Sequence, residues 1–176
     1  MIRADRMRQY GVAPVEKRTP GKKLVSIVLP AHNEERNLPE VHRRLSHVLS
    51  PLSYDLEFIF VDDGSSDRTV DVMDELSRRD PRVKYIGLSR NFGHQYALTA
   101  GLDFASGDAV VSLDTDLQHP PELIPTLLQK WEGGAQVVNT IRRSTESITL
   151  FKKVSAAVFY RLFRLVSPVQ IGRAHV

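Results

Sequence analysis

The sequence predicts an α/β fold built on a mostly parallel central sheet. Short apolar runs rich in β-branched residues alternate with longer segments whose apolar residues recur at helical spacing. Polar residues follow directly after most of the apolar runs. Strands separated by helices of this length are typical of βαβ units, which place successive strands parallel to one another in one sheet.

Five strands and four helices follow from this alternation. The first strand is predicted at 24–30, where LVSIVLP is apolar and β-branched, and the first helix at 33–50. Gly64 permits a turn after the second strand, and Ser66 or Asp67 is expected to cap the second helix. The other strands are predicted at 56–61, 83–88, 108–113 and 135–141, and the other helices within 66–80, 93–106 and 120–134.

Composition places the chain among globular proteins of one domain. Its 176 residues are 41% hydrophobic, which is enough for a buried core. It has no cysteine, which excludes disulfides and thiolate metal sites and fits a reducing compartment. No apolar run approaches the roughly 18 residues that a membrane-spanning helix needs.

Charge is unevenly distributed along the chain, whose net charge is +3. Basic residues are in excess in 1–23, which we interpret as a basic flexible tail, and again in 142–176, whereas acidic residues are in excess between them. An acidic centre argues against a nucleic-acid-binding face. Basic ends suit an anionic membrane surface, although simple solvation also explains them.

Functional side chains gather at the predicted carboxyl ends of four strands. Ligands of parallel sheets bind in the crevice beyond these ends, so residues far apart in sequence are expected to meet at one edge. We therefore predict a binding site there. The residues concerned are Pro30, His32, Asn33 and Glu34 after the first strand, Asp62 and Asp63 after the second, Ser89, Arg90 and Asn91 after the third, and Asp114 and Asp116 after the fourth.

Asp114-Thr115-Asp116 offers hard oxygen ligands in a short turn. Mg²⁺ or Mn²⁺ is typically held by one or two carboxylates together with waters and the phosphate oxygens of a substrate. Gln118 offers a further oxygen, so the predicted metal ligands are Asp114, Asp116 and Gln118. Asp-x-Asp is also common in ordinary surface turns, and its position at the end of a buried strand is what favours the metal site.

Asp62 and Asp63 permit two interpretations. Asp-Asp-Gly-Ser is good turn chemistry, but a carboxylate at this position could also accept hydrogen bonds from a base or ribose. The chain has neither the GxGxxG nor the GxxxxGKS/T motif, so a Rossmann dinucleotide site and a P-loop are not supported. It also lacks HExxH, and His94 and His119 are best interpreted as ordinary hydrogen-bonded histidines.

Taken together, these clusters resemble the family 2 glycosyltransferases, in particular the dolichol-phosphate mannosyltransferase and bactoprenol glucosyltransferase branch. The matching stretches cover most of residues 25–143. They are VSIVLPAHNEERNLPEV, FIFVDDGSSDRTVDVM, LSRNFGHQYALTAGLDFASGDAVVSLDTDLQHPPELIP and VVNTIRR. The resemblance implies a GT-A fold, which is a Rossmann-like three-layer sandwich, and a nucleotide-sugar-binding domain at 24–143.

The resemblance also implies roles for individual residues. Asp114 and Asp116 would be the catalytic pair that meets the diphosphate and the metal, with Thr115 beside them and Gln118 completing the metal shell. His32 stands where the family often has an aromatic residue. The remaining nucleotide-binding residues implied are Pro30, His32 and Glu34 in the pocket, Val61, Asp62 and Asp63 at the base and ribose, and Arg142 near the diphosphate.

The reaction implied is inverting transfer of a sugar from a UDP- or GDP-sugar to a polyprenyl phosphate at the cytoplasmic face of the plasma membrane. A phosphate monoester is anionic near neutral pH, so it can attack the anomeric carbon without a strong base. Two alternatives stay open: a family 2 enzyme that acts on a glycan hydroxyl, which needs a carboxylate base, and a non-catalytic nucleotide-binding fragment. Self-association into a homo-oligomer also stays open.

The C-terminal part carries two further predictions. Residues 144–170 are expected to form a basic amphipathic helix next to the membrane, or alternatively a helix that packs on the core. Residues 171–176 match one translation frame of a common sequencing adapter, so we expect them to be non-native. Family members continue further, and we expect this chain to be truncated, with the fold incomplete at its C-terminus.

Overall fold

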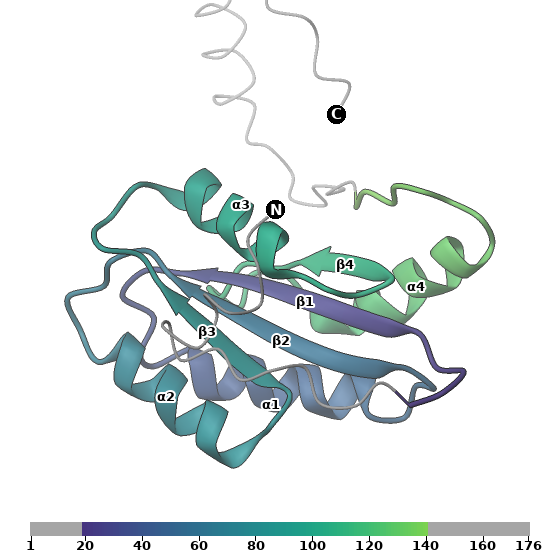
Figure 1. The fold of residues 1–176 in the computed structure, drawn as a ribbon, viewed down its shortest axis with the longest axis horizontal. Coiled ribbons are helices and arrows are strands. Elements are labelled where there is room, and N and C mark those ends of the chain that lie inside the picture. The colour runs from purple at the N-terminus through teal and green to yellow at the C-terminus, as the bar shows by residue number, and fades with distance from the viewer. Residues whose placement is uncertain (1–18, 141–176) are drawn as a thin grey trace, which may run out of the picture. The chain divides into compact units, whose positions relative to one another are not determined.

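The computed structural model describes residues 19–140; the predictions for Arg142, for the helix at 144–170 and for 171–176 lie outside the described residues. Four strands form one sheet in the order β3-β2-β1-β4 (Figure 1). All three strand pairs are parallel, which confirms the predicted sheet. The strands are β1 Leu24–Ala31, β2 Asp55–Asp62, β3 Val83–Gly87 and β4 Ala109–Ser112.

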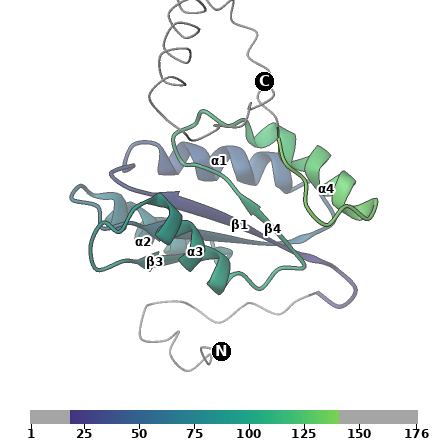
Figure 2. The ribbon, with the colours of Figure 1, turned by 90° about the horizontal axis from the view of Figure 1, so that it is seen from above.

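Helices cover both faces of the sheet, which gives three layers. The helices are α1 Leu38–Leu49, α2 Thr69–Arg79, α3 His94–Phe104 and α4 Ile124–Glu132, the last preceded by a short 3₁₀ turn at Pro121–Leu123. Helices α1 and α4 lie on one face and α3 on the other (Figure 2). Within 19–140, no helix has the length and apolar character needed to cross a bilayer.

Alternate residues of β1 enter two separate cores, as the two-residue period of a strand requires. Ile27 and Leu29 pack with apolar residues of α1, α2 and α4, whereas Val28 packs with residues of α3. Helix α3 approaches the sheet closely at Gly101, where an added Cβ would lie 2.3 Å from Cγ1 of Val28. Both faces of the strand are therefore buried, which explains why its sequence is apolar almost throughout.

The strand predicted at 135–141 is wrong for the residues that the structure describes. Residues 135–140 have no strand conformation, and Val137 is 78% exposed. Helix α4 ends at Gly133 and Gly134, the latter with a φ of 97°, and the apolar run that follows forms no ladder with β4. An apolar run becomes a strand only where a neighbouring edge accepts its hydrogen bonds, and this one has no such partner within 19–140.

Helix α2 begins slightly later than its predicted caps imply. Its first residue is Thr69, and Asp67 Oδ1 accepts a hydrogen bond from the Thr69 amide at 2.9 Å. The amide and hydroxyl of Ser66 instead donate to the side-chain oxygen of Asn33. Asp67 thus supplies the expected acceptor at the start of the helix, while Ser66 ties the loop to the segment after β1.

A buried ionic network joins three strands beneath α3. Lys84 Nζ lies 2.6 Å from Glu57 Oε2, and the two side chains are only 9% and 3% exposed. Ser26 and Ser106 also donate to the Glu57 carboxylate. Burial raises the pKa of Glu57, but these hydrogen bonds more than offset it, so its pKa lies below the ordinary value.

Removing one partner of this pair is expected to destabilise the fold strongly. Lys84→Met leaves a buried carboxylate without its cation, and the free energy of unfolding should fall by about 3 kcal/mol. Adding Glu57→Gln should restore most of this loss, because an amide keeps hydrogen-bonding capacity without charge. Urea unfolding measures both variants, with exposed Lys130→Met as the control; a loss below about 1 kcal/mol for Lys84→Met would contradict the prediction.

A second carboxylate makes stability depend on pH. Asp80 accepts hydrogen bonds from Arg82 and lies 2.8 Å from Nε2 of His42. Burial raises the pKa of Asp80, but the hydrogen bonds from Arg82 and His42 outweigh this effect and lower it to about 2. Because the folded pKa is depressed, the stabilisation is complete above the unfolded value of about 3.9 and disappears as pH falls through about 2.

We expect Asp80→Asn to flatten the acid limb of the stability curve. A pKa difference of nearly 2 units corresponds to roughly 2 to 3 kcal/mol. Asp80→Asn should be less stable than the unmodified chain by about this amount at neutral pH, and the two chains should differ little at pH 2. Urea unfolding between pH 6 and pH 2 measures the difference from the unmodified chain. Asp71→Asn, which alters an exposed carboxylate on α2, is the control, and equal curves for the two variants would reject the assignment.

Candidate active site

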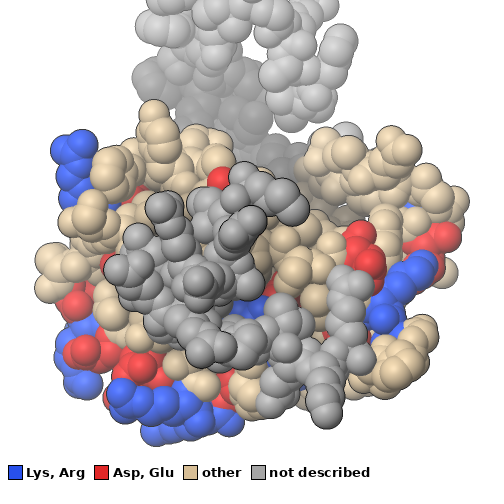
Figure 3. Space-filling model, viewed as in Figure 1, with Lys and Arg blue, Asp and Glu red and all other residues tan. Residues whose placement is uncertain are grey.

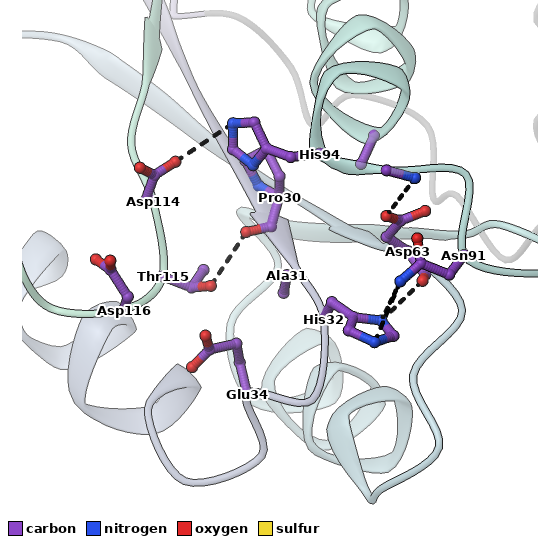
Figure 4. Close-up of a pocket in the computed structure, with 12 residues that line it drawn as sticks. Pro30, Ala31, His32, Glu34, Asp63, Asn91, His94, Asp114, Thr115 and Asp116 are labelled. Carbon is purple, nitrogen blue, oxygen red and sulfur yellow. Dashed lines mark hydrogen bonds and ion pairs between the residues drawn. The ribbon is translucent and has the colours of Figure 1, made fainter. Parts of the chain in front are cut away.

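A pocket of about 340 Å³ opens at the carboxyl edge of the sheet. It lies beside the end of β1, where the strand order reverses because β2 and β3 extend the sheet on one side and β4 on the other. Open α/β sheets bind ligands at such switch points. The pocket is lined by Pro30, Ala31, His32, Glu34, Asp63, Asn91, Gly93, His94, Ala97, Asp114, Thr115 and Asp116 (Figure 4).

His32 links three of the loops that form the pocket. Its Nδ1 is 2.9 Å from the carbonyl oxygen of Asp63, which can only accept, so a neutral ring carries its proton on Nδ1. Nε2 is then an acceptor, 3.1 Å from Nδ2 of Asn33 and 3.3 Å from Nδ2 of Asn91. The imidazole therefore holds together the segments that follow β1, β2 and β3.

Asp63 fixes the loop that leads into α3. Asp63 is 4% exposed, and its two carboxylate oxygens accept hydrogen bonds from the amides of Phe92 and Gly93 at 2.8 and 2.9 Å. Gly64 packs against the same loop, since an added Cβ would lie 2.3 Å from the carbonyl carbon of Arg90. The Asp-Asp-Gly sequence thus positions one wall of the pocket.

The Asp-Thr-Asp segment forms the opposite wall. Thr115 is 3% exposed, and its hydroxyl donates to the carbonyl oxygen of Pro30 at 3.1 Å, which joins the ends of β4 and β1. Asp116 Oδ1 accepts a hydrogen bond of 3.0 Å from the amide of Gln118. The residue between them, Leu117, has a φ of 61°. A non-glycine residue in this left-handed region is uncommon and shows that the turn is tightly constrained.

Asp114 lies between two histidines. Its carboxylate oxygens are 3.6 Å from Nε2 of His94 and 3.6 Å from Nδ1 of His119. These distances are too long for good hydrogen bonds, and the Asp114 side chain is 43% exposed. Among residues 19–140, neither Asp114 nor Asp116 forms an ion pair with a lysine or arginine. Two pocket carboxylates that no lysine or arginine of 19–140 neutralises make this wall suited to a bound cation.

The donor set fits a hard divalent cation. Within the described ranges no group of three or more histidine, aspartate or glutamate residues is placed to hold a metal. Mg²⁺ and Mn²⁺ do not need such a group, because they are commonly held by one or two carboxylates plus waters and substrate phosphates. Asp114 and Asp116 satisfy that smaller requirement.

The structure brings most, but not all, of the predicted residues to the pocket. Asp62 is buried and its carboxylate accepts from the amide of Ser65, so it stabilises a turn. Val61 is fully buried in the core under α3, and Gln118 is exposed and does not line the pocket. Asn33, Ser89 and Arg90, also predicted at this edge, do not line the pocket. The predicted residues that do line it are Pro30, His32, Glu34, Asp63, Asn91, Asp114, Thr115 and Asp116.

Three lining residues come from the third loop, and of these Gly93 and His94 were not among the predicted site residues. Asn91 follows β3, Gly93 precedes α3 and His94 begins it. Asn91 had been noted as polar and at a strand end, which was a usable signal. The role of Gly93 depends on its φ of 100°, and no feature of the local sequence marks that conformation.

Comparison with known proteins agrees with this geometry. The family model for glycosyl transferase family 2 matches residues 26–171. The chain belongs to this family. It is 47% identical over 146 residues to an uncharacterized glycosyltransferase, YkcC, of Bacillus subtilis, covering 83% of this chain and 45% of the relative. It is 39% identical over 147 residues to the bactoprenol glucosyl transferase of Shigella phage SfV, covering 84% and 48%. The family 2 chain thus spans about half the length of these relatives.

A solved structure confirms the fold of this family 2 chain. Glucosyl-3-phosphoglycerate synthase from Mycobacterium tuberculosis, in complex with Mn²⁺, UDP and glucosyl-3-phosphoglycerate, superposes with a TM-score of 0.56 at 25% identity. The match covers 84% of this chain and 55% of the synthase. The expected GT-A fold, with helices on both faces of a parallel sheet, is therefore confirmed.

Asp63→Asn is expected to loosen the loop before α3. An amide group in place of one carboxylate oxygen turns an N–H donor towards a backbone N–H, and the hydrogen bond that remains is uncharged. The free energy of unfolding should fall by about 2 kcal/mol. Amide hydrogen exchange should lose protection at Phe92 and Gly93 first, with Asp71→Asn as the control. Unchanged exchange at both amides would show that the carboxylate does not fix the loop.

Proposed function

We propose that this chain is the donor-binding part of a glycosyltransferase that moves a sugar from a UDP- or GDP-sugar to a polyprenyl phosphate. The observation that carries the proposal is the pocket at the switch point, where within 19–140 neither Asp114 nor Asp116 is paired with a lysine or arginine. The SfV relative is a bactoprenol glucosyl transferase, and the mycobacterial synthase is seen with UDP and Mn²⁺. The first supports a lipid-linked acceptor, and the second supports a nucleoside diphosphate donor and a divalent metal.

Each wall of the pocket contacts a different part of the nucleotide-sugar donor. Asp63, His32 and Asn91 lie on one side and Asp114 and Asp116 on the other (Figure 4). We assign the first side to the nucleoside and the second to the diphosphate. His32 offers an imidazole ring and Asn91 an amide to the nucleoside, whereas Asp63 acts chiefly through the loop it holds.

A divalent cation, Mg²⁺ or Mn²⁺, belongs on the acidic side. Asp114 and Asp116 would hold it, and the predicted contribution of Gln118 requires its side chain to turn into the pocket. When bound, such a cation neutralises the diphosphate and makes it a better leaving group. The constrained turn at Leu117 keeps the two carboxylates in place before the donor arrives, which lowers the cost of ordering them.

The acceptor needs positioning more than activation. A phosphate monoester oxygen attacks the anomeric carbon, a new C–O bond forms, and the bond to the nucleoside diphosphate breaks on the opposite face. The configuration is therefore inverted. Because the second pKa of the phosphate is about 6, the nucleophile is already anionic and no carboxylate base is required. The predicted Arg142 and 144–170 helix would serve the diphosphate and the membrane, at its cytoplasmic face.

Binding of the donor should require the metal and the Asp-Thr-Asp segment. Calorimetric titration of UDP-glucose and GDP-mannose, with and without Mn²⁺ or Mg²⁺, is expected to show metal-dependent binding of one nucleotide sugar. Asp116→Asn should weaken that binding by about 100-fold, since loss of a direct ligand costs at least as much as loss of a supporting one.

Two controls define the result. Asp71→Asn changes an exposed carboxylate on α2 and should leave binding unaltered. Metal-independent binding that survives both Asp114→Asn and Asp116→Asn in a folded chain would contradict the assignment. The acceptor is tested with the full-length enzyme. Transfer to a hydroxyl acceptor rather than to a polyprenyl phosphate would contradict the proposed acceptor but leave the proposed donor site unchanged.

A further inference from the structure

Three exposed side chains contact one another in sequence beside the pocket, with Arg90 over the ring of Phe92 and the ring of Tyr96 tilted at 56° to it. The Arg90 guanidinium lies 4.7 Å from the centroid of the Phe92 ring, and the Phe92 and Tyr96 centroids are 6.4 Å apart. Phe92 is 42% exposed and Tyr96 is 68% exposed. The pocket is lined by the intervening Asn91, Gly93 and His94, so this aromatic rim, defined as Arg90, Phe92 and Tyr96, borders the pocket without entering it.

The exposure of the aromatic rim is built into the fold. Asp63 holds the Phe92 amide at 2.8 Å, and Gly64 leaves no room for the Arg90 backbone to move towards it. Tyr96 is in the first turn of α3, and its amide donates to Gly93. Single exposed aromatic residues are common, but two adjacent exposed rings with a guanidinium on a constrained segment indicate a contact surface.

The charge around the aromatic rim differs from that of the rest of the domain. Residues 81–102 contain no aspartate or glutamate, although the centre of the chain is acidic overall, and the single acidic residue of α3, Asp103, is in its last turn, away from the rim. The surface over α2, by contrast, shows dense mixed charge (Figure 3). Leu102, further along α3, is also 46% exposed. An uncharged, aromatic surface with one arginine is complementary to an anionic, partly apolar partner.

We propose that the aromatic rim contacts an anionic phospholipid bilayer. Amphipathic rings favour the headgroup region, and an arginine buries its stem there while its guanidinium pairs with a phosphate. The inference rests on the proposed function, because an acceptor lipid that stays in the membrane requires the mouth of the pocket to face the bilayer. The aromatic rim borders that mouth and is therefore placed to touch the headgroups first.

Vesicle co-sedimentation of the 176-residue chain tests the aromatic rim. Vesicles of phosphatidylcholine with phosphatidylglycerol are compared with phosphatidylcholine alone. Arg90→Gln and Tyr96→Ala are each expected to weaken binding to the anionic vesicles about fivefold. Arg79→Gln and Val70→Ala, which change exposed residues at the α2 surface, are the matched controls, and circular dichroism verifies folding. Equal affinities for rim and control variants, or no binding by the unmodified chain, would overturn the proposal.

A site-specific probe separates the aromatic rim from any contribution of 141–176. In a Trp131→Phe background, Phe92→Trp places the single tryptophan in the rim. Its emission should shift to the blue on vesicle addition and be quenched by brominated lipid. A chain that sediments with vesicles while this tryptophan is neither shifted nor quenched would show that the rim does not touch the bilayer.

Two further measurements distinguish the competing explanations. Sedimentation velocity detects self-association, and loss of a dimer in Tyr96→Ala with unchanged vesicle binding would assign the aromatic rim to a second copy instead. Titration with UDP-glucose and GDP-mannose reports on the pocket, whose affinity should be the same in the rim variants. Failure of the unmodified chain to bind either nucleotide sugar would overturn the proposed function, and the vesicle results would still decide the role of the rim.

Discussion

Hydrogen bonding along both edges of β1 determines the position of the site. The strand pairs with β2 from Leu24 to Ala31 and with β4 from Val25 to Val28, in both cases in parallel. Parallel pairing puts the ends of these strands at one edge, and the reversal of strand order leaves a crevice between the loops that follow. Polar residues more than 80 positions apart in sequence, such as those after β1 and β4, are adjacent for this reason alone.

Burial separates the four aspartates at this edge into two kinds. Asp62 and Asp63 are almost completely buried, and backbone amides satisfy their carboxylates, so they stabilise loops. Asp114 and Asp116 are partly exposed, and in the described part of the chain no lysine or arginine pairs with either. A buried carboxylate without such bonds would be strongly unfavourable, whereas water solvates a partly exposed carboxylate until a cation binds it. The same residue type therefore serves structure on one wall and ligand binding on the other.

The sequence was sufficient to predict the sheet, most of the lining residues and the family. Strands and helices are recognised from local periodicity, and the meeting of the polar residues that follow the strands is a consequence of the parallel topology. It was insufficient for the apolar run at 135–141, because a strand also needs a neighbouring edge that sequence does not display. The role of Asp63 depends on amides 29 and 30 residues away, and only the folded loop reveals them.

One carboxylate links the pocket to the aromatic rim. Asp63 binds the amides of two consecutive residues, and of these Gly93 lines the pocket while Phe92 belongs to the rim. Because both hydrogen bonds are made within the chain itself, its own contacts order the loop for both surfaces. A site that is preorganised in this way loses little conformational entropy when it is occupied. Donor binding in the pocket therefore adds little order to the aromatic rim, and bilayer contact at the rim adds little order to the pocket. The coupling free energy between the two events should be small.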